Sequence, residues 1–146
     1  MIRSKLNPIL TRKDIPDHPP YFSDVTSVFN PGAIKFNNKY ILLLRVQSRS
    51  RETFIVAAES DNGIEFSVRN EIVNFVGIEN VTDKIYHIYD ARITQIADIY
   101  YIMFAMDMDS GCQLGLGKTM DFKRFDFLGI TSDEDIRNGV LFPEKI

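Results

Sequence analysis

The sequence contains few of the residues that form cross-links or bind metals. It has one cysteine, Cys112, two histidines and no tryptophan. A single cysteine cannot form an internal disulfide, and it is typical of a protein kept in a reducing compartment. The histidines, His18 and His87, lack the spacing of a metal site. We therefore expect no metal and no organic cofactor.

Long apolar runs and an excess of basic residues are also absent. The longest apolar run, residues 40–44, is too short to cross a bilayer, and residues 1–20 do not read as a charged segment followed by an apolar one. There are 17 basic and 20 acidic residues, giving a net charge of −3. These features predict a cytoplasmic protein that binds neither nucleic acid nor membranes.

What the sequence does contain is typical of one globular domain. Of its 146 residues, 45% are hydrophobic and 25% are charged, which is an ordinary composition for a single domain of this length. Residues 1–20 are polar and hold four of the six prolines. They predict an irregular N-terminal arm, with residues 21–146 forming the domain.

Alternating and apolar runs separated by turn residues predict four antiparallel strands within residues 28–80. The expected strands are 33–36, 39–46, 54–60 and 64–69. Asn37-Asn38 fits a hairpin turn because asparagine tolerates positive φ, and residues 61–63, Asp-Asn-Gly, form a strong turn signal. The first unit therefore reads as an all-β meander.

The same order of strands and turns recurs within residues 88–130. The expected strands are 91–96, 100–106, 112–118 and 122–128, with a loop at 107–111. Five landmarks pair at an offset of 60 residues that slips to 59: Asn30 with Asp90, Asn38 with Asp98, Tyr40 with Tyr100, Ser60 with Thr119, and Phe66 with Phe125. A repeated unit of four short strands is typical of a β-propeller blade.

A third unit is predicted to begin near residue 140. Residues 140–145, Val-Leu-Phe-Pro-Glu-Lys, are similar to residues 28–31, Val-Phe-Asn-Pro. Two blades and part of a third cannot close a propeller ring, so we expect residues 21–146 to be the N-terminal part of a longer protein. Its open strand edges would favour self-association into a homo-oligomer. A complete two-sheet β-sandwich of about eight strands is the alternative.

Asp90 and Arg92 are the first candidate functional residues. They lie two positions apart at the predicted opening of a strand, so their side chains would point to the same face. Such a pair can protonate a sugar and hold an anion, or it can form only a strand-end salt bridge. Because the innermost strand of each blade starts near the propeller axis, the repeat predicts that Asn30 and Asp90 converge on one site.

Six short stretches follow one another along the chain: 7–10 (NPIL), 28–33 (VFNPGA), 42–46 (LLLRV), 90–94 (DARIT), 118–122 (KTMDF) and 141–146 (LFPEKI). Together they resemble the N-terminal part of glycoside hydrolase family 130, the β-mannoside phosphorylases and their hydrolase relatives. The resemblance implies a five-bladed β-propeller, of which this chain would cover the first two blades and the start of the third.

The resemblance also implies an inverting phosphorolysis. A single aspartate, matched by Asp90, would protonate the leaving oxygen of a β-mannoside oligosaccharide, while inorganic phosphate attacks the anomeric carbon to give mannose 1-phosphate. By the same resemblance, Asn30, Arg45 and Arg92 match substrate-binding positions and Lys145 matches the phosphate side. Phosphate is a co-substrate that needs cations rather than a second carboxylate to hold it.

Departures from the family pattern leave the activity open. Many members read Glu-Asp-Pro-Arg where residues 89–92 read Tyr-Asp-Ala-Arg, and Arg-Val-Glu-Asp where residues 45–48 read Arg-Val-Gln-Ser. Three acidic residues, at positions 47, 48 and 89, are thus replaced by neutral ones, and one proline is replaced by alanine. A mannoside hydrolase of the same family, and an inactive or carbohydrate-binding propeller fragment, are the alternatives to a phosphorylase.

Overall fold

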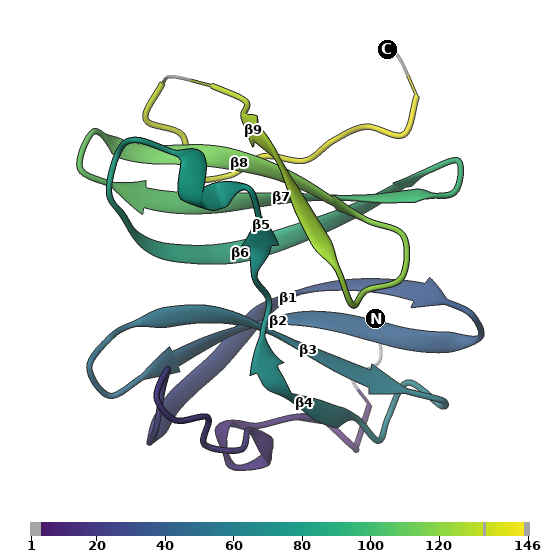
Figure 1. The fold of residues 1–146 in the computed structure, drawn as a ribbon. Helices are drawn as coiled ribbons and strands as arrows, with labels where there is room; N and C mark the ends of the chain where they lie inside the picture. The colour runs from purple at the N-terminus through teal and green to yellow at the C-terminus, as the bar shows by residue number, and fades with distance from the viewer. Residues whose placement is uncertain (1–3, 133, 145–146) are drawn as a thin grey trace.

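The chain forms two β-sheets stacked in layers in the computed structural model, which describes residues 4–132 and 134–144 (Figure 1). The strand order is β1-β2-β3-β4 in the first sheet and β5-β9-β8-β7-β6 in the second. The strands are β1 (Val25–Phe36), β2 (Lys39–Ser48), β3 (Thr53–Ser60), β4 (Ser67–Ile72), β5 (Phe75–Val76), β6 (Ile85–Ile96), β7 (Ile99–Met108), β8 (Gly111–Thr119) and β9 (Phe125–Ile130). The all-β prediction is confirmed.

The two sheets repeat one meander. In each, four consecutive strands pair antiparallel with their neighbours, and the second sheet gains the two-residue strand β5, which pairs parallel with β9. The first hairpin turns through Asn37 and Asn38, which have φ values of +47° and +63°. Two consecutive positive φ values suit the twist of a two-residue hairpin, and asparagine tolerates them at little cost. The predicted turn at these residues is confirmed.

The fourth strand of the first sheet starts later than predicted. β4 begins at Ser67 rather than at residue 64. The reason is a side-chain interaction: Asn62 Oδ1 accepts hydrogen bonds from the backbone N–H groups of Ile64 and Glu65, each at 2.9 Å. A donor held by a nearby side chain is not available to a strand ladder, so the turn extends past its sequence signal.

The last strand of the second sheet is displaced for the same reason. β9 begins at Phe125 rather than at residue 122. Asp121 Oδ1 accepts hydrogen bonds from the backbone N–H groups of Lys123 at 2.8 Å and Arg124 at 3.0 Å. The loop predicted at 107–111 is instead a two-residue turn between Met108 and Gly111. Side chains that bond the local backbone thus explain the late starts of β4 and β9, whereas β1 and β6 begin earlier than predicted, at Val25 and Ile85.

The main apolar core lies between the sheets. Alternate residues of β2, Ile41 and Leu43, pack against Ile102 and Phe104 of β7, and all four are buried. The intervening residues of β2 face the other way, where Ile15 of the N-terminal segment covers part of the first sheet. This segment contains a 3₁₀ helix, Arg12–Asp14, capped by Thr11. Alternation along β2 thus gives the first sheet two apolar faces.

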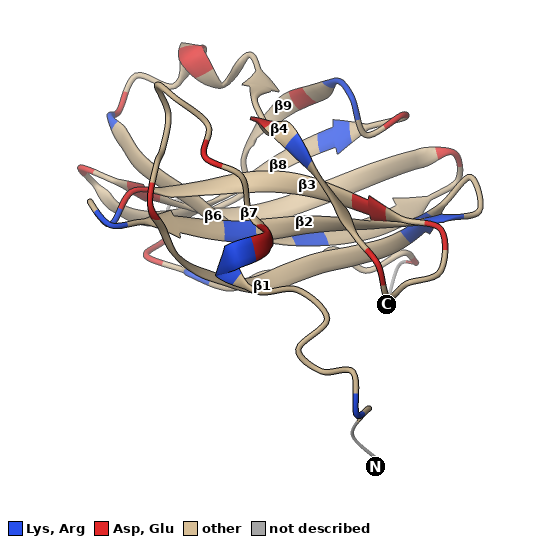
Figure 2. Ribbon diagram, turned by 90° about the horizontal axis from the view of Figure 1, so that it is seen from below, with Lys and Arg blue, Asp and Glu red and all other residues tan. Residues whose placement is uncertain are grey.

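Charged residues of both signs are interspersed along the strands and loops (Figure 2). Within residues 4–132 and 134–144, no helix is long and apolar enough to cross a membrane. Residues 134–144 contain no strand. The third unit expected near residue 140 therefore stays a prediction, as do the domain limits of 1–20 and 21–146.

Candidate active site

β1 contains a β-bulge at Asn30 and Pro31. Phe29 pairs with Arg45 of β2 and Gly32 pairs with Leu43, so β1 has one residue more than its partner between these two pairs. Asn30 adopts a φ of +45° within the bulge. A bulge re-aims the side chains of its strand and tolerates a proline that a regular central ladder would not.

β6 contains the equivalent bulge at Asp90 and Ala91. Tyr89 pairs with Ala105 of β7 and Arg92 pairs with Met103, again with one extra residue in the inner strand. Asp90 has a φ of +57°. Asparagine and aspartate are among the non-glycine residues that most readily adopt such positive values. Asp90 therefore lies inside β6, whereas the sequence placed it at the opening of a strand.

The two bulges meet where β1 and β6 pass each other. A Cβ added to Gly32 would lie 2.6 Å from the carbonyl oxygen of Ala91, so the strands approach as closely as a glycine allows. Asn30 Nδ2 lies 3.2 Å from both carboxylate oxygens of Asp90. The prediction that Asn30 and Asp90 lie close together, although 60 residues separate them in sequence, is confirmed.

Asp90 has a cationic partner from the first sheet. Arg45 Nη1 donates a hydrogen bond to Asp90 Oδ1 at 3.1 Å, and the two side chains are 19% and 13% exposed. At this exposure the pair is only partly screened by water, so its two charges interact more strongly than a surface pair does. Among the contacts of the described residues, Asp90 Oδ1 accepts from Asn30 and Arg45, while Oδ2 accepts only from Asn30.

The Arg45 guanidinium lies between two aromatic rings. Its central carbon is 4.5 Å from the ring centroid of Phe29 and 4.2 Å from that of Tyr89. Arg45 Nε is buried, and within residues 4–132 and 134–144 it has no hydrogen-bond partner. Cation–π contacts with these two rings therefore contribute much of what orients this side chain.

Tyr89 is itself fixed by polar contacts beneath the site. Its hydroxyl donates to Asp107 Oδ1 at 2.8 Å and lies 3.4 Å from Cys112 Sγ. Burial, together with these two contacts, raises the pKa of Tyr89 far above its ordinary value. Burial also raises the pKa of the Cys112 thiol. Both groups are thus held neutral, which suits a supporting role.

A pocket of about 270 Å³ opens beside Asp90. Its charged and polar lining consists of Asp90, Arg92, Arg137 and Asn138. The segment that carries Arg137 and Asn138 runs back across the second sheet, where Thr94 Oγ1 donates to the carbonyl of Leu141 at 2.8 Å. A carboxyl group thus faces the same small space as two guanidinium groups. Such an arrangement can hold an anion next to a proton donor.

The predicted site residues have different outcomes. Asn30, Arg45 and Asp90 are brought into contact. Arg92 lines the same pocket but donates its hydrogen bond to the carbonyl of Ala91, so the cation paired with Asp90 is Arg45. Lys145 lies outside the described residues, and its phosphate-binding role stays a prediction.

Sequence reasoning missed Arg137 and Asn138 at the pocket and the contacts of Tyr89 with Arg45 and Asp107. Arg137 and Asn138 lie just before residues 141–146, the last stretch that carries the family resemblance, but they are not part of that stretch. Tyr89 was noted only as a departure from the family pattern. No cluster of three or more histidine, cysteine or acidic side chains that could hold a metal ion occurs within residues 4–132 and 134–144.

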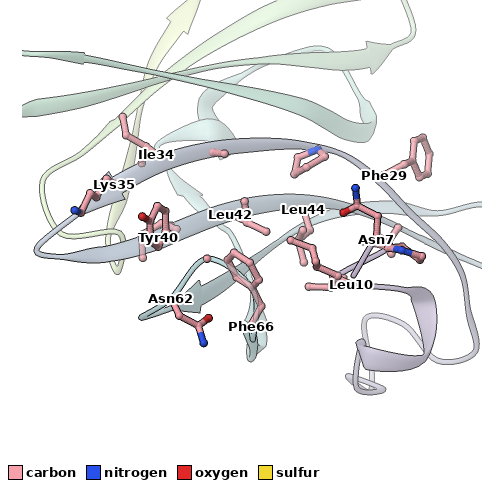
Figure 3. Close-up of a pocket in the computed structure, with 17 residues that line it drawn as sticks. Asn7, Leu10, Phe29, Ile34, Lys35, Tyr40, Leu42, Leu44, Asn62 and Phe66 are labelled. Carbon is pink, nitrogen blue, oxygen red and sulfur yellow. The ribbon is translucent and has the colours of Figure 1, made fainter. Parts of the chain in front are cut away.

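A larger hollow, of about 810 Å³, lies elsewhere, between the N-terminal segment and the outer face of the first sheet. Asn7 and Leu10 lie near Leu44 at one end of it, and Asn62 and Phe66 lie at the other (Figure 3). Its lining is mostly apolar, and Lys35 is its one charged residue among those described. Because it offers no acid, the smaller pocket at Asp90 is the candidate active site despite its size.

The sequence is similar to proteins of known activity. A family profile described as beta-1,4-mannooligosaccharide phosphorylase, that of glycoside hydrolase family 130, matches residues 4–146. The chain is 32% identical to 4-O-beta-D-mannosyl-D-glucose phosphorylase of Bacteroides fragilis, covering 84% of this chain and 34% of that protein. It is 27% identical to the beta-1,4-mannooligosaccharide phosphorylase of Ruminococcus albus, covering 99% of this chain and 43% of that protein. The chain thus spans less than half of the length of these two relatives.

The fold is similar to solved structures as well. A beta-1,2-mannobiose phosphorylase from Listeria innocua, in complex with beta-1,2-mannobiose, matches with a TM-score of 0.75 at 22% identity, over 99% of this chain and 55% of that one. A second structure, whose description reports family members that are glycoside hydrolases targeting beta-1,2 mannosidic linkages in Candida mannan, matches with a TM-score of 0.71 at 19% identity, over 88% of this chain and 40% of that one. At these identities the matches establish the fold, which is that of five-bladed β-propellers.

Proposed function

Because the chain belongs to glycoside hydrolase family 130, we propose that it supplies the general acid and part of the sugar and phosphate sites of an inverting β-mannoside phosphorylase. The observation that carries the proposal is the setting of Asp90. A partly buried carboxyl group, bonded to Arg45 and Asn30, faces a pocket that also contains two further arginines. This is the composition that an acid beside a bound anion requires.

Asp90 would protonate the leaving oxygen. Arg45 and Asn30 both contact Oδ1, so Oδ2 is the oxygen better placed to carry the proton. As the bond from the anomeric carbon to the glycosidic oxygen breaks, that oxygen takes the proton and leaves as a hydroxyl group. Asp90 is left as a carboxylate, which Arg45 and Asn30 stabilise by charge-assisted hydrogen bonds.

Phosphate would enter as the nucleophile. One of its oxygens forms the new bond to the anomeric carbon on the face opposite the leaving group, which gives mannose 1-phosphate with inverted configuration. Arg92 and Arg137 supply cationic forks at the pocket, and Lys145 is proposed to add a further charge. Among the described residues that line this pocket, Asp90 is the one carboxylate. A hydrolase needs a second carboxylate to activate water. What favours phosphorolysis here is that the two relatives compared above are phosphorylases.

The test is the release of mannose 1-phosphate from a panel of β-mannosides, with and without phosphate. It should be run on this chain and on the full coding sequence in which these residues lie. Phosphate-dependent release that is lost in Asp90→Asn supports the proposal. Failure to release any sugar from any β-mannoside with the full coding sequence overturns it and makes a carbohydrate-binding propeller the better description.

Hydrolysis is the second candidate, because one structural relative is described as belonging to a family that contains hydrolases of mannosidic linkages. It predicts free mannose from the same panel, at a rate independent of phosphate. This chain differs from many family members in having neutral residues at positions 47, 48 and 89, where they have acidic ones. The sequence therefore leaves phosphorolysis and hydrolysis both open, and the assay decides between them.

A further inference from the structure

We propose that Tyr89 is a positioning residue that holds the Arg45 guanidinium against Asp90. The inference rests on the proposed function, in which Asp90 is the acid. The first observation is that Arg45 makes few polar contacts. Within residues 4–132 and 134–144 its side chain has one hydrogen-bond partner, Asp90, and its buried Nε has none. A guanidinium is usually fixed by several donors in a fork, so something else must orient this one.

The orientation comes from two aromatic rings. Phe29 and Tyr89 lie 4.5 Å and 4.2 Å from the guanidinium carbon. Phe29 pairs directly with Arg45 in the first sheet, and so moves with it. Tyr89 belongs to β6 in the second sheet and directly precedes Asp90. Tyr89 is therefore the contact that sets where Arg45 sits relative to the acid on the other sheet.

Tyr89 can do this because its ring cannot swing. It is 6% exposed, and its hydroxyl is held by Asp107 Oδ1 at 2.8 Å with Cys112 Sγ 3.4 Å away. The same Asp107 oxygen lies 3.9 Å from Nη1 of Arg137, which also lines the pocket. The tyrosine–aspartate pair thus contacts both Arg45 and Arg137, and Asp107, which is partly exposed, is the second positioning residue of this network.

The ordinary explanation is that Tyr89 merely fills the core with Met103, Ala105, Cys112 and Leu114. Tyr86, three residues earlier in β6, also donates its hydroxyl to an aspartate, Asp109, but it is exposed and its ring lies beside Lys84. Tyr86 therefore controls for the loss of a tyrosine–aspartate hydrogen bond on β6. Packing is separated from positioning by the Arg45→Met background, in which a packing loss at Tyr89 persists and a positioning loss does not.

The experiment measures kcat and KM for mannoside and phosphate with the full coding sequence. We expect Tyr89→Leu to lower kcat about tenfold, as the loss of one desolvated cation–π contact implies, with KM for phosphate changed less. Tyr89→Phe keeps the ring and should lose less than about threefold. Tyr86→Phe should change neither constant. In an Arg45→Met background, Tyr89→Leu should cost nothing further, because its effect passes through Arg45.

A second readout keeps the inference testable if the protein proves inactive. The Nε–H resonance of Arg45 in this chain, assigned with Arg45→Lys, should show a ring-current shift that Tyr89→Leu reduces and Tyr89→Phe retains. Tyr89→Met replaces Tyr89→Leu if the latter fails to fold. An unchanged Arg45 resonance, or a kinetic loss that persists at full size in the Arg45→Met background, overturns the inference. Absent turnover with an altered resonance would overturn the proposed function and leave the positioning role standing.

Discussion

The two sheets share one backbone design but carry different chemistry at equivalent positions. Asn30 in β1 and Asp90 in β6 occupy the same bulge with φ values of +45° and +57°. The backbone therefore accepts either an amide or a carboxyl group at this point. The repeated backbone fixes where the two side chains meet, and the side chain at each bulge decides which chemistry it brings to that point.

A second pair makes the same comparison far from the site. Asn62 in the first sheet and Asp121 in the second each accept two backbone N–H groups with one side-chain oxygen, and so build the same turn. Here the carboxylate is exposed and bonded only within its own turn. A carboxylate at a repeated position is thus a candidate functional group only where it faces a pocket and bonds side chains from elsewhere in the chain, as Asp90 bonds Arg45 and Asn30.

The site also needs both sheets because they are not equivalent around the bulge. The partner of Phe29 across the first hairpin is Arg45, but the partner of Tyr89 across the second is Ala105. The first sheet contributes the cation and the second contributes the acid. The contact between them is possible because Gly32 lets the inner strands touch.

The largest expected effect comes from making the second bulge resemble the first. Asp90→Asn should lower kcat/KM for mannoside phosphorolysis by about 10² to 10⁴, because an amide cannot donate an acidic proton to the leaving oxygen. The measurement is mannose 1-phosphate release by the full coding sequence. Asp121→Asn is the control, since it makes the same substitution at the other repeated position and should leave the rate unchanged. Equal rates for Asp90→Asn and the wild type would refute the assignment of the acid.

Removing the cation tests whether the first sheet supports the acid. Arg45→Met should lower the free energy of unfolding by roughly 1–3 kcal/mol, between the values for an exposed and a fully buried pair, because it leaves the Asp90 side chain partly buried without its cation. Urea unfolding at neutral pH measures this. Arg69→Met, at an arginine of equal exposure that bonds Glu59, is the control for activity: it should destabilise the protein without reducing saccharide turnover. Activity that falls equally in both variants would count against a special role for Arg45.

Closing the gap between the inner strands should have a smaller effect. Gly32→Ala places a methyl group 2.6 Å from the carbonyl oxygen of Ala91, and we expect it to lower the free energy of unfolding by about 1–3 kcal/mol. At Gly139 the added Cβ would meet the end of the Leu114 side chain, which can move, so Gly139→Ala should lower the free energy of unfolding by less than about 1 kcal/mol. If Gly139→Ala lowers the urea midpoint more than Gly32→Ala does, the inner strands do not approach closely at Gly32.

Much of this arrangement could be predicted because the sequence repeats. The pairing of Asn30 with Asp90 at an offset of 60 residues predicted a contact that is present at 3.2 Å. The pairing of Arg45 with Asp90 could not be predicted in this way. The equivalent of Arg45 in the second sheet is Ala105, so no symmetry in the sequence points to a contact between residues 45 positions apart.

The bulges and strand ends were missed for local reasons. The alternation of apolar and polar residues predicts strands by assuming a regular ladder, and this assumption fails where a bulge adds a residue. Pro31 inside β1 was the available signal, because proline in a strand marks a bulge or an edge strand. The starts of β4 and β9 were missed because Asn62 and Asp121 bond the backbone beyond their turns. Such side-chain bonds depend on rotamers that a residue pattern does not specify.

The smallest expected effect concerns the two equivalent turns, which are built by Asn62 in the first sheet and by Asp121 in the second. Backbone N–H groups of Arg124 and Lys123 lower the pKa of Asp121 below its ordinary value of 3.8. A carboxylate whose pKa is lower in the folded state stabilises the fold fully above its unfolded pKa, and this contribution is lost as the pH falls through the folded pKa. Asn62, which builds the same turn in the first sheet, does not titrate.

Asp121→Asn should therefore be less stable than the wild type at pH 7, by under about 1 kcal/mol because the group is exposed, and the difference should shrink below pH 4. Asn62→Asp should show the opposite pattern, because it adds a titratable carboxylate to the first sheet. This variant should gain stability relative to the wild type at pH 7, and the gain should shrink below pH 4. Urea unfolding at pH 7 and pH 3 measures both, and comparison with the wild type cancels the other carboxylates. A stability difference that stays constant between the two pH values would mean that Asp121 bonds its turn as a neutral group does, and that the two turns are equivalent in charge as well as in shape.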